Sequence, residues 1–122
     1  MEVKIDNMKH HLMNLTPSPF NMIKNGTKTI ELRLYDDKRR KIQTGDRIKF
    51  VNTEKNDETL EVEVIDLFVF DSFKTLYTEL PLLECGYTEK DIGTASPNDM
   101  DLYYSKEKQQ KYGVVGIKIA LL

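Results

Sequence analysis

The stretch GTKTIELRL, residues 26–34, decides how this sequence is read. In a strand, successive side chains point to opposite faces of the sheet. One face of this segment then carries Ile30, Leu32 and Leu34, and the other carries Thr29, Glu31 and Arg33. The pattern predicts a strand with one apolar face in a core. Its charged face either meets solvent or lines a cleft.

The length of 122 residues fits one domain with one core. We expect a single domain over residues 1–122, with residues 1–8 loose. The formal net charge is -2, so a general electrostatic attraction to nucleic acid is not expected. Any polyanion has to be held by a local patch. The basic run Lys38–Lys41 is one candidate, and a solvated loop is the commoner role for such a run.

A reducing, cytoplasmic compartment is the expected location. Cys85 is the only cysteine, so an internal disulfide is excluded. The N-terminal residues do not have the apolar core of a secretory signal. No apolar run approaches the roughly 20 residues that cross a bilayer, so no membrane role is expected. Cys85 has no histidine near it in sequence, and we expect a partly buried thiol rather than a nucleophile.

The N-terminal half predicts three strands and a helix besides the opening stretch. A strand over Lys9–Leu15 precedes a helix that Thr16 caps and that ends at Gly26. Alternating apolar residues then predict a hairpin of two strands. These strands cover Arg47–Asn52 and Leu60–Phe70, with the hairpin turn at Asn56–Asp57. In the second strand the alternating apolar residues change from even-numbered to odd-numbered positions after Val64, which predicts a bulge.

The C-terminal half predicts helices and one closing strand. Asp71 or Ser72 caps a short helix that ends before Pro81. The pattern between Pro81 and Pro97 is weak. Residues 98–111 are predicted to be helical with a break at Ser105, and residues 114–122 to form a strand. Strands with inserted helices and no regular alternation of the two predict an α+β fold, a small mixed β-barrel of about five or six strands with helices packed around it.

The spacing G-x-K-x-x-E-x-R, formed by Gly26, Lys28, Glu31 and Arg33, resembles the signature of the ASCH domain, a branch of the PUA-like superfamily. Two later segments strengthen the resemblance. TGDRIKF at 44–50 is similar to the segment that enters the next strand of the family, and YYSKEKQQKYGVVGIKI at 103–119 is similar to its closing helix and strand. The resemblance implies a PUA-like β-barrel and a cleft beside the strand that begins near Lys28.

The resemblance also implies RNA or a nucleotide-like ligand, because ASCH domains are associated with such partners. Some small bacterial members remove the acetyl group from N4-acetylcytidine. In those hydrolases a lysine matches Lys28, whereas a threonine hydroxyl stands where this sequence has Glu31. Glu31 has no hydroxyl, so the resemblance does not support a mechanism in which a hydroxyl is the nucleophile. Whether the protein is an enzyme is left open.

Lys28, Glu31 and Arg33 are the first candidate ligand-binding residues. Glu31 would accept hydrogen bonds from a base, or activate water if the protein is a hydrolase. Lys28 would stabilise an anionic oxygen, and Arg33 would offer a planar fork to a phosphate or stack on a base. The structural alternative is an exposed ion pair of Glu31 with Lys28 or Arg33. In another alternative, Arg33 is a buried partner that keeps Glu31 ionised and oriented.

Tyr103, Tyr104 and Ser105 are the second candidates, since tyrosine rings stack on bases and Ser105 offers a hydroxyl. Half-buried packing is the other role open to the tyrosines. His10 and His11 point to opposite faces of a strand, so no metal site is predicted. The sequence also has no glycine-rich phosphate loop, and no cofactor is expected.

Three hypotheses follow. The leading one is an ASCH domain that binds RNA or a nucleotide-like ligand in a cleft lined by Lys28, Glu31 and Arg33. The alternative is an amidohydrolase that acts on a modified nucleoside such as N4-acetylcytidine, with Lys28 and Glu31 as catalytic residues. The third is a protein-interaction module, because a fold does not fix a function.

Overall fold

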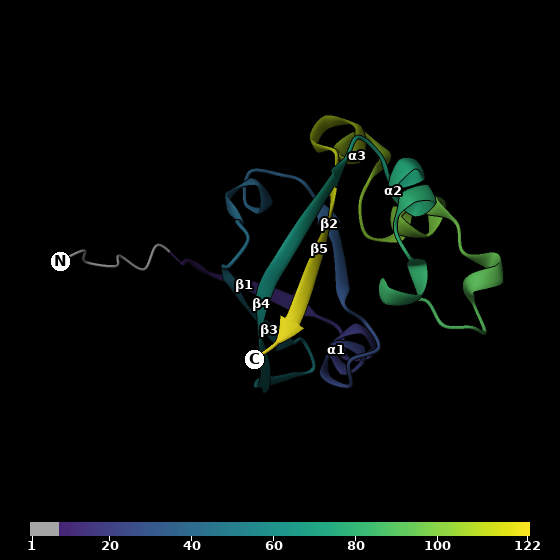
Figure 1. Ribbon diagram of the computed structural model, residues 1–122. Coiled ribbons are helices and arrows are strands. Elements are labelled where there is room, and N and C mark those ends of the chain that lie inside the picture. Colours follow the sequence, from purple (N-terminus) through teal and green to yellow (C-terminus); the bar gives the residue numbers. More distant parts are fainter. Residues whose placement is uncertain (1–7) are drawn as a thin grey trace.

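Five strands form one curled sheet in a computed structural model that describes residues 8–122. The strands are β1 (His10–Leu15), β2 (Ile30–Leu34), β3 (Arg47–Asn52), β4 (Lys55–Phe70) and β5 (Val114–Leu121). Their order in the sheet is β1-β3-β4-β5-β2, and only the β1–β3 pair is parallel. The long strands β4 and β5 run side by side through the middle of the molecule (Figure 1).

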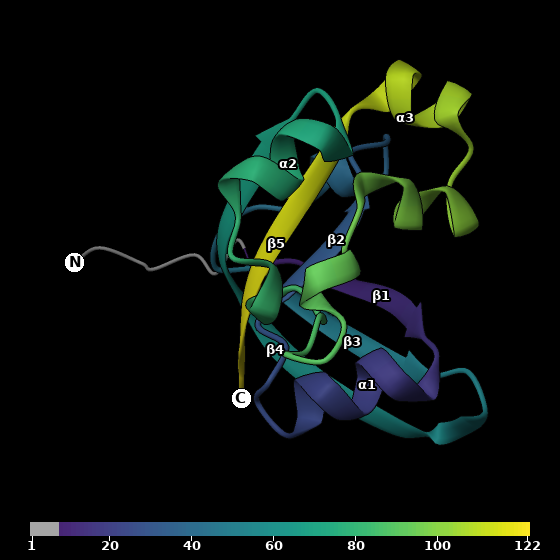
Figure 2. The same ribbon diagram turned by 90° about the vertical axis from the view of Figure 1, so that its right-hand side faces the viewer.

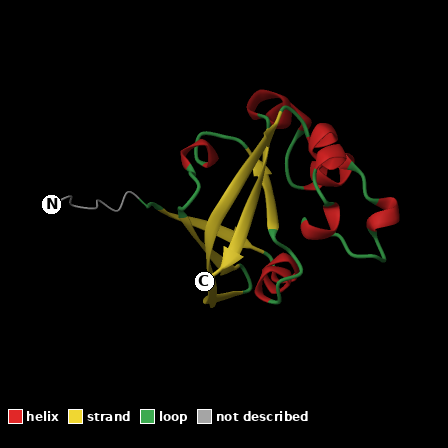
Figure 3. Cartoon of the chain, viewed as in Figure 1, coloured by secondary structure: helices red, strands yellow, loops and turns green. Residues whose placement is uncertain are grey.

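Three α-helices and four short 3-10 helices pack around the sheet (Figure 3). The α-helices are α1 (Pro17–Lys24), α2 (Phe73–Glu79) and α3 (Lys106–Tyr112). The 3-10 helices are η1 (Arg39–Lys41), η2 (Leu82–Glu84), η3 (Ile92–Thr94) and η4 (Pro97–Leu102). The predicted α+β class is confirmed: the sheet is a curled half-barrel of five strands with helices around it.

The curled sheet separates two apolar cores. The first core fills the concave side and includes Phe20 of α1, Phe50 of β3 and Ile117 of β5. The second core lies under α2 and contains the predicted apolar face of β2, together with Phe73 and Leu76. Because β2 and β5 are covered on both faces, a charged side chain on the other face of β2 has to be paired.

The position of the β3–β4 turn was predicted wrongly. The turn lies at Thr53–Glu54 rather than at Asn56–Asp57, and β4 therefore begins at Lys55. The side-chain oxygen of Asn52 accepts a hydrogen bond from the backbone N–H of Glu54 at 3.0 Å. This contact lets Asn52 form the tight turn, and Asn56 and Asp57 are left free to continue the strand.

Other local predictions are confirmed. The register between β4 and β5 shifts between Val64 and Asp66, as the change in the apolar positions after Val64 indicated. Of the two candidate caps of α2, Ser72 is the one used, and its side chain accepts from the N–H of Thr75. The predicted break at Ser105 is present. Before it lies the 3-10 helix η4, whereas α3 begins directly after it.

Residues 1–7, which belong to the segment expected to be loose, lie outside the described residues. Within residues 8–122 no helix is long and apolar enough to span a membrane.

Candidate functional site

A cavity of about 490 Å³ opens between the sheet and the helical segments that follow β4. Its floor comes from the end of β1, the start of α1 and the strand β2. Its roof comes from α2 and the chain between η2 and η4 (Figure 2). Ligand-binding pockets of small molecules typically have about 300–1,000 Å³. The cavity therefore has the size of a small-molecule site.

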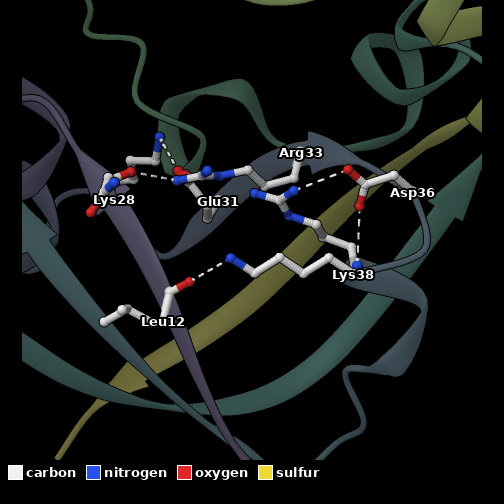
Figure 4. A network of polar contacts seen from close by, with 8 residues as sticks. Leu12, Lys28, Glu31, Arg33, Asp36 and Lys38 are labelled. Atoms are coloured by element: carbon white, nitrogen blue, oxygen red, sulfur yellow. Dashed lines mark hydrogen bonds and ion pairs between the residues drawn. The ribbon is translucent and has the colours of Figure 1, made fainter.

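Lys28, Glu31 and Arg33 meet at the floor of this cavity (Figure 4). The Nζ of Lys28 lies 2.8 Å from Oε1 of Glu31, and the Nε of Arg33 lies 2.7 Å from Oε2. Glu31 is 3% exposed, so this is not the solvent-exposed ion pair that the sequence allowed. One buried carboxylate is held between two cations, one on each oxygen.

The two cations determine the charge state of Glu31. Burial by itself would raise the pKa of a carboxyl group, but the adjacent Lys28 and Arg33 more than offset it and hold the pKa of Glu31 below its usual range. Burial also opposes the charge of Arg33, and the attraction of Glu31 outweighs it, so that the pKa of Arg33 is raised. Glu31 is therefore ionised at neutral pH, with both oxygens engaged.

Arg33 also joins two strands that are far apart in the sheet. Besides Glu31, its guanidinium donates to the carbonyl oxygen of Asn14 at 2.9 Å, near the end of β1. Strands β1 and β2 lie at opposite ends of the sheet order, and the curl of the sheet brings them together here. The planar fork of arginine permits both contacts at once. Arg33 thus fixes one wall of the cavity.

Lys28 reaches the cavity from the turn after α1. Gly26 has a φ of 84°, a left-handed conformation that favours glycine, and it lets the chain turn from the helix toward β2. The N–H of Lys28 donates to the carbonyl oxygen of Met22 at 3.0 Å. The stem of Lys28 then passes beneath Gly86, where an added Cβ would lie 3.5 Å from its Cδ and Nζ.

The second group of candidates is divided by the structure. Tyr103 and Tyr104 both line the cavity. Tyr103 is 71% exposed at its rim. Tyr104 is half-buried and stacks on Phe73, with ring centroids 6.2 Å apart. Ser105 is not one of the cavity-lining residues, and its hydroxyl accepts from the N–H of Lys108 as the cap of α3.

The sequence did not reveal three residues in the roof of the cavity. The hydroxyls of Tyr77 and Tyr87 lie 2.7 Å apart, and the hydroxyl of Tyr87 donates to Oδ2 of Asp99 at 2.6 Å. Of the three, Tyr87 belongs to the segment between Pro81 and Pro97, whose pattern was weak. The spacing Ser96-Pro97-x-Asp99 indicates the capping box of η4, but nothing local predicts that Asp99 meets a tyrosine.

The basic run Lys38–Lys41 lies outside the cavity lining and makes contacts of its own. Lys38 donates to the carbonyl oxygen of Leu12 (Figure 4). Arg39 pairs with Asp36 at 3.0 Å, and Arg40 donates to the carbonyl oxygen of Tyr112. These contacts fasten the loop after β2 to the sheet and to the end of α3.

No metal centre is found in the described part of the chain. Within residues 8–122, no group of three or more histidine, cysteine or acidic side chains could hold an ion. His11 instead contacts Oδ2 of Asp46 at 2.8 Å, where Asp46 also accepts from the backbone N–H groups of Lys9 and Gln43. This buried carboxylate joins the start of β1 to the turn before β3.

The comparisons with known proteins give a family and a fold. The sequence model of the ASCH domain matches residues 13–122. The crystal structure of the hypothetical protein PH0355 is 33% identical and covers 93% of this chain and 99% of its own, with a TM-score of 0.76. The solution structure of protein PF0455 from Pyrococcus furiosus is also 33% identical, covering 93% and 97%, with a TM-score of 0.69.

A more distant structure shares the fold. The ASCH protein from Zymomonas mobilis is 17% identical and covers 92% of this chain and 67% of its own, with a TM-score of 0.61. No curated protein matches the chain.

Proposed function

The chain belongs to the ASCH domain family, and from that premise we propose that it binds RNA or a nucleotide-like ligand in the cleft lined by Lys28, Glu31 and Arg33. The observation that carries the proposal is the cavity of about 490 Å³ with this charged group at its floor and tyrosines at its rim and roof. Aromatic rings together with a few fixed polar groups are the usual means of holding a base.

The floor supplies hydrogen-bond donors in a fixed position. An ammonium group has three N–H donors and a guanidinium has five. Glu31 takes one donor from Lys28 and one from Arg33, and Asn14 takes a second from Arg33. The remaining donors of the two cations are available to a carbonyl oxygen of the ligand. In this arrangement Glu31 orients the donors and contributes little directly to recognition.

The same contacts disfavour the hydrolase alternative in which Glu31 activates water. A general base that works near neutral pH needs a pKa close to neutrality and a free lone pair directed at water. The pKa of Glu31 is lowered, and each of its oxygens accepts from a cation. We therefore favour binding over turnover by this carboxylate.

A protein-interaction role receives less support from the shape of the site. Protein partners generally dock on broad surfaces of roughly 800 Å² per side. The charged residues of this site lie instead at the bottom of a cavity, and Glu31 and the side chains of Lys28 and Arg33 are mostly buried. A ligand that inserts one flat group fits this geometry better than a protein face does.

The proposal is tested by titrating the protein with a short single-stranded RNA and, separately, with N4-acetylcytidine while free acetate is followed by NMR. Binding to either ligand that weakens at least about tenfold in Lys28→Ala, and stays unchanged in the matched control Lys41→Ala, supports the proposal. Release of acetate by the wild type that stops in Lys28→Ala supports the hydrolase instead. Absence of binding to both ligands contradicts the proposed function.

A further inference from the structure

A chain of two hydroxyls and a carboxylate crosses the roof of the cavity. It runs from Tyr77 of α2 through Tyr87 to Asp99 of η4, and all three residues line the cavity. The two tyrosine rings meet edge to face, with centroids 5.8 Å apart, and Tyr77 also makes an edge-to-face contact with Phe73. These contacts hold the rings and leave the hydroxyl of Tyr77 at the end of the chain.

The carboxylate fixes the direction of every hydrogen bond in this chain. Hydrogen bonds from Tyr87 and from the N–H of Ser96 lower the pKa of Asp99, so at neutral pH it is ionised and can only accept. Burial, together with the bond to Asp99, raises the pKa of Tyr87, which keeps its proton. Tyr87 has one proton and donates it to Asp99. The bond between the two hydroxyls must then come from the proton of Tyr77.

Tyr77 is thereby left as an acceptor. Its only proton is directed at Tyr87, so the lone pairs of its oxygen are the group that it can offer to a ligand. A ligand atom at this point has to be an N–H or O–H donor. A carbonyl oxygen placed there would face another acceptor, and the hydroxyl of Tyr77 could turn toward it only by breaking its bond to Tyr87.

The charges of the cavity favour an uncharged donor over a phosphate. The lining contains two cations, Lys28 and Arg33, and three carboxylates, Glu31, Asp91 and Asp99. Both cations are already paired with Glu31. A phosphate placed deep in the cavity would therefore meet an excess of negative charge, whereas a neutral heterocycle with an amino group would not.

We propose, on the basis of the nucleotide-binding function proposed above, that Tyr77 is a specificity-determining residue that accepts a hydrogen bond from the exocyclic amino group of a base. Tyr87 and Asp99 are positioning residues that fix its proton. The phosphates of a nucleotide or RNA then lie outside the cavity. The site distinguishes amino-bearing bases from bases that carry a carbonyl or a hydrogen at the same position.

The test measures dissociation constants by NMR for two sets of nucleosides. Cytidine and adenosine carry the amino group, whereas pyrimidin-2-one riboside and purine riboside carry hydrogen there. Uridine and inosine carry a carbonyl. Wild-type protein is expected to bind the amino member of a set about tenfold more tightly than the hydrogen member, and the carbonyl member most weakly. Tyr77→Phe is expected to remove the difference between the amino and hydrogen members.

Tyr87→Phe separates orientation from contact. It keeps the hydroxyl of Tyr77 but frees it to rotate and donate, so the carbonyl member should bind more tightly than it binds to wild type. A gain of this kind cannot result from partial unfolding. Tyr35 lies outside the cavity lining, so Tyr35→Phe is the matched control. It should keep the wild-type order of nucleoside affinities.

Different results would overturn the role of Tyr77 and the proposed nucleotide-binding function. Nucleoside binding in which wild-type protein does not prefer the amino member in either set overturns the role of Tyr77 and leaves the proposed function standing. The role of Tyr77 is also overturned if Tyr77→Phe keeps the wild-type preference for the amino member. If no nucleoside and no RNA binds, both proposals are overturned.

Discussion

The Nε of Arg33 lies 2.7 Å from Oε2 of Glu31, two residues earlier on the same strand. Both side chains leave the same face of β2, and that face is covered rather than wet. Burying an ionised carboxylate is unfavourable unless it is paired and hydrogen-bonded. The pairing of Glu31 with Arg33 and Lys28 thus satisfies the buried charge and also builds the floor of the cavity.

Replacing Glu31 by glutamine leaves two mostly buried cations without their counter-charge. Loss of one partner from a buried ion pair typically destabilises a protein by about 3–5 kcal/mol. We expect Glu31→Gln to lower the free energy of unfolding, measured by urea denaturation at pH 7, by an amount in this range. Glu89→Gln, at an exposed position, should change it by less than about 0.5 kcal/mol. An equal effect of the two substitutions would contradict the role assigned to Glu31.

The contribution of Glu31 to stability should also depend on pH. Its pKa is lower in the folded protein than in the unfolded chain, where glutamate has a pKa of about 4.3. The stabilisation is therefore complete above about pH 4.3 and is lost as the pH falls through the lower, native pKa. The difference in melting temperature between wild type and Glu31→Gln should be constant near neutrality and shrink below about pH 4. A difference that grows on acidification would contradict this assignment.

Arg33→Lys keeps the charge but loses the fork. A lysine ammonium cannot reproduce the planar geometry by which Arg33 contacts both Glu31 and the carbonyl oxygen of Asn14. We expect a loss of about 1–3 kcal/mol in the free energy of unfolding. The matched substitution Arg40→Lys, at an exposed arginine, should cost less. Indistinguishable unfolding curves for Arg33→Lys and wild type would show that a positive charge at this position is sufficient and that the planar guanidinium is not required.

Tyr103 and Tyr104 should have separable roles. Tyr103→Ala removes an exposed ring at the cavity rim and should weaken RNA binding by about 1–3 kcal/mol with little change in melting temperature. Tyr104→Ala removes a half-buried ring that stacks on Phe73, and it should lower the melting temperature by several degrees. Calorimetric titration and thermal unfolding of both variants check this. The opposite assignment of the two effects would show that Tyr104 is the stacking residue.

Cys85 should be inert in the native protein. It is 5% exposed, and burial raises the pKa of its thiol to about 11. Since the thiolate is the reactive form, a disulfide reagent at pH 8 should modify Cys85 slowly in native protein and rapidly in urea. Fast modification of the native protein would contradict the burial of this residue.

Residues 26–34 predicted much of the fold because apolar residues occupy every second position of β2 and a glycine turn precedes it. The side chains of Ile30, Leu32 and Leu34 do enter one core. The burial of Glu31 was not predicted, since alternation assigns a side chain to a face but does not say what covers that face. That face is shared with Ile117 and Val115 of β5 in the first core, and β1 lies against it, with the carbonyl oxygen of Asn14 accepting from Arg33.

The roof of the cavity was beyond sequence reasoning for a related reason. Tyr77, Tyr87 and Asp99 meet only because the irregular chain between α2 and η4 folds over β2. Short 3-10 helices have no strong periodicity from which to infer a buried face. The prediction of the β3–β4 turn was wrong for a local reason. The side chain of Asn52 forms the turn, which therefore comes before Asn56–Asp57.

The most direct test of the central claim is to map amide chemical-shift changes in isotope-labelled protein as a short single-stranded RNA is added. The proposed site predicts the largest changes at β2, at Gly86 and around Tyr103, and predicts that in Tyr103→Ala they require higher RNA concentrations. Changes centred instead on the basic run Lys38–Lys41, with the cavity residues unaffected, would contradict binding in the cavity.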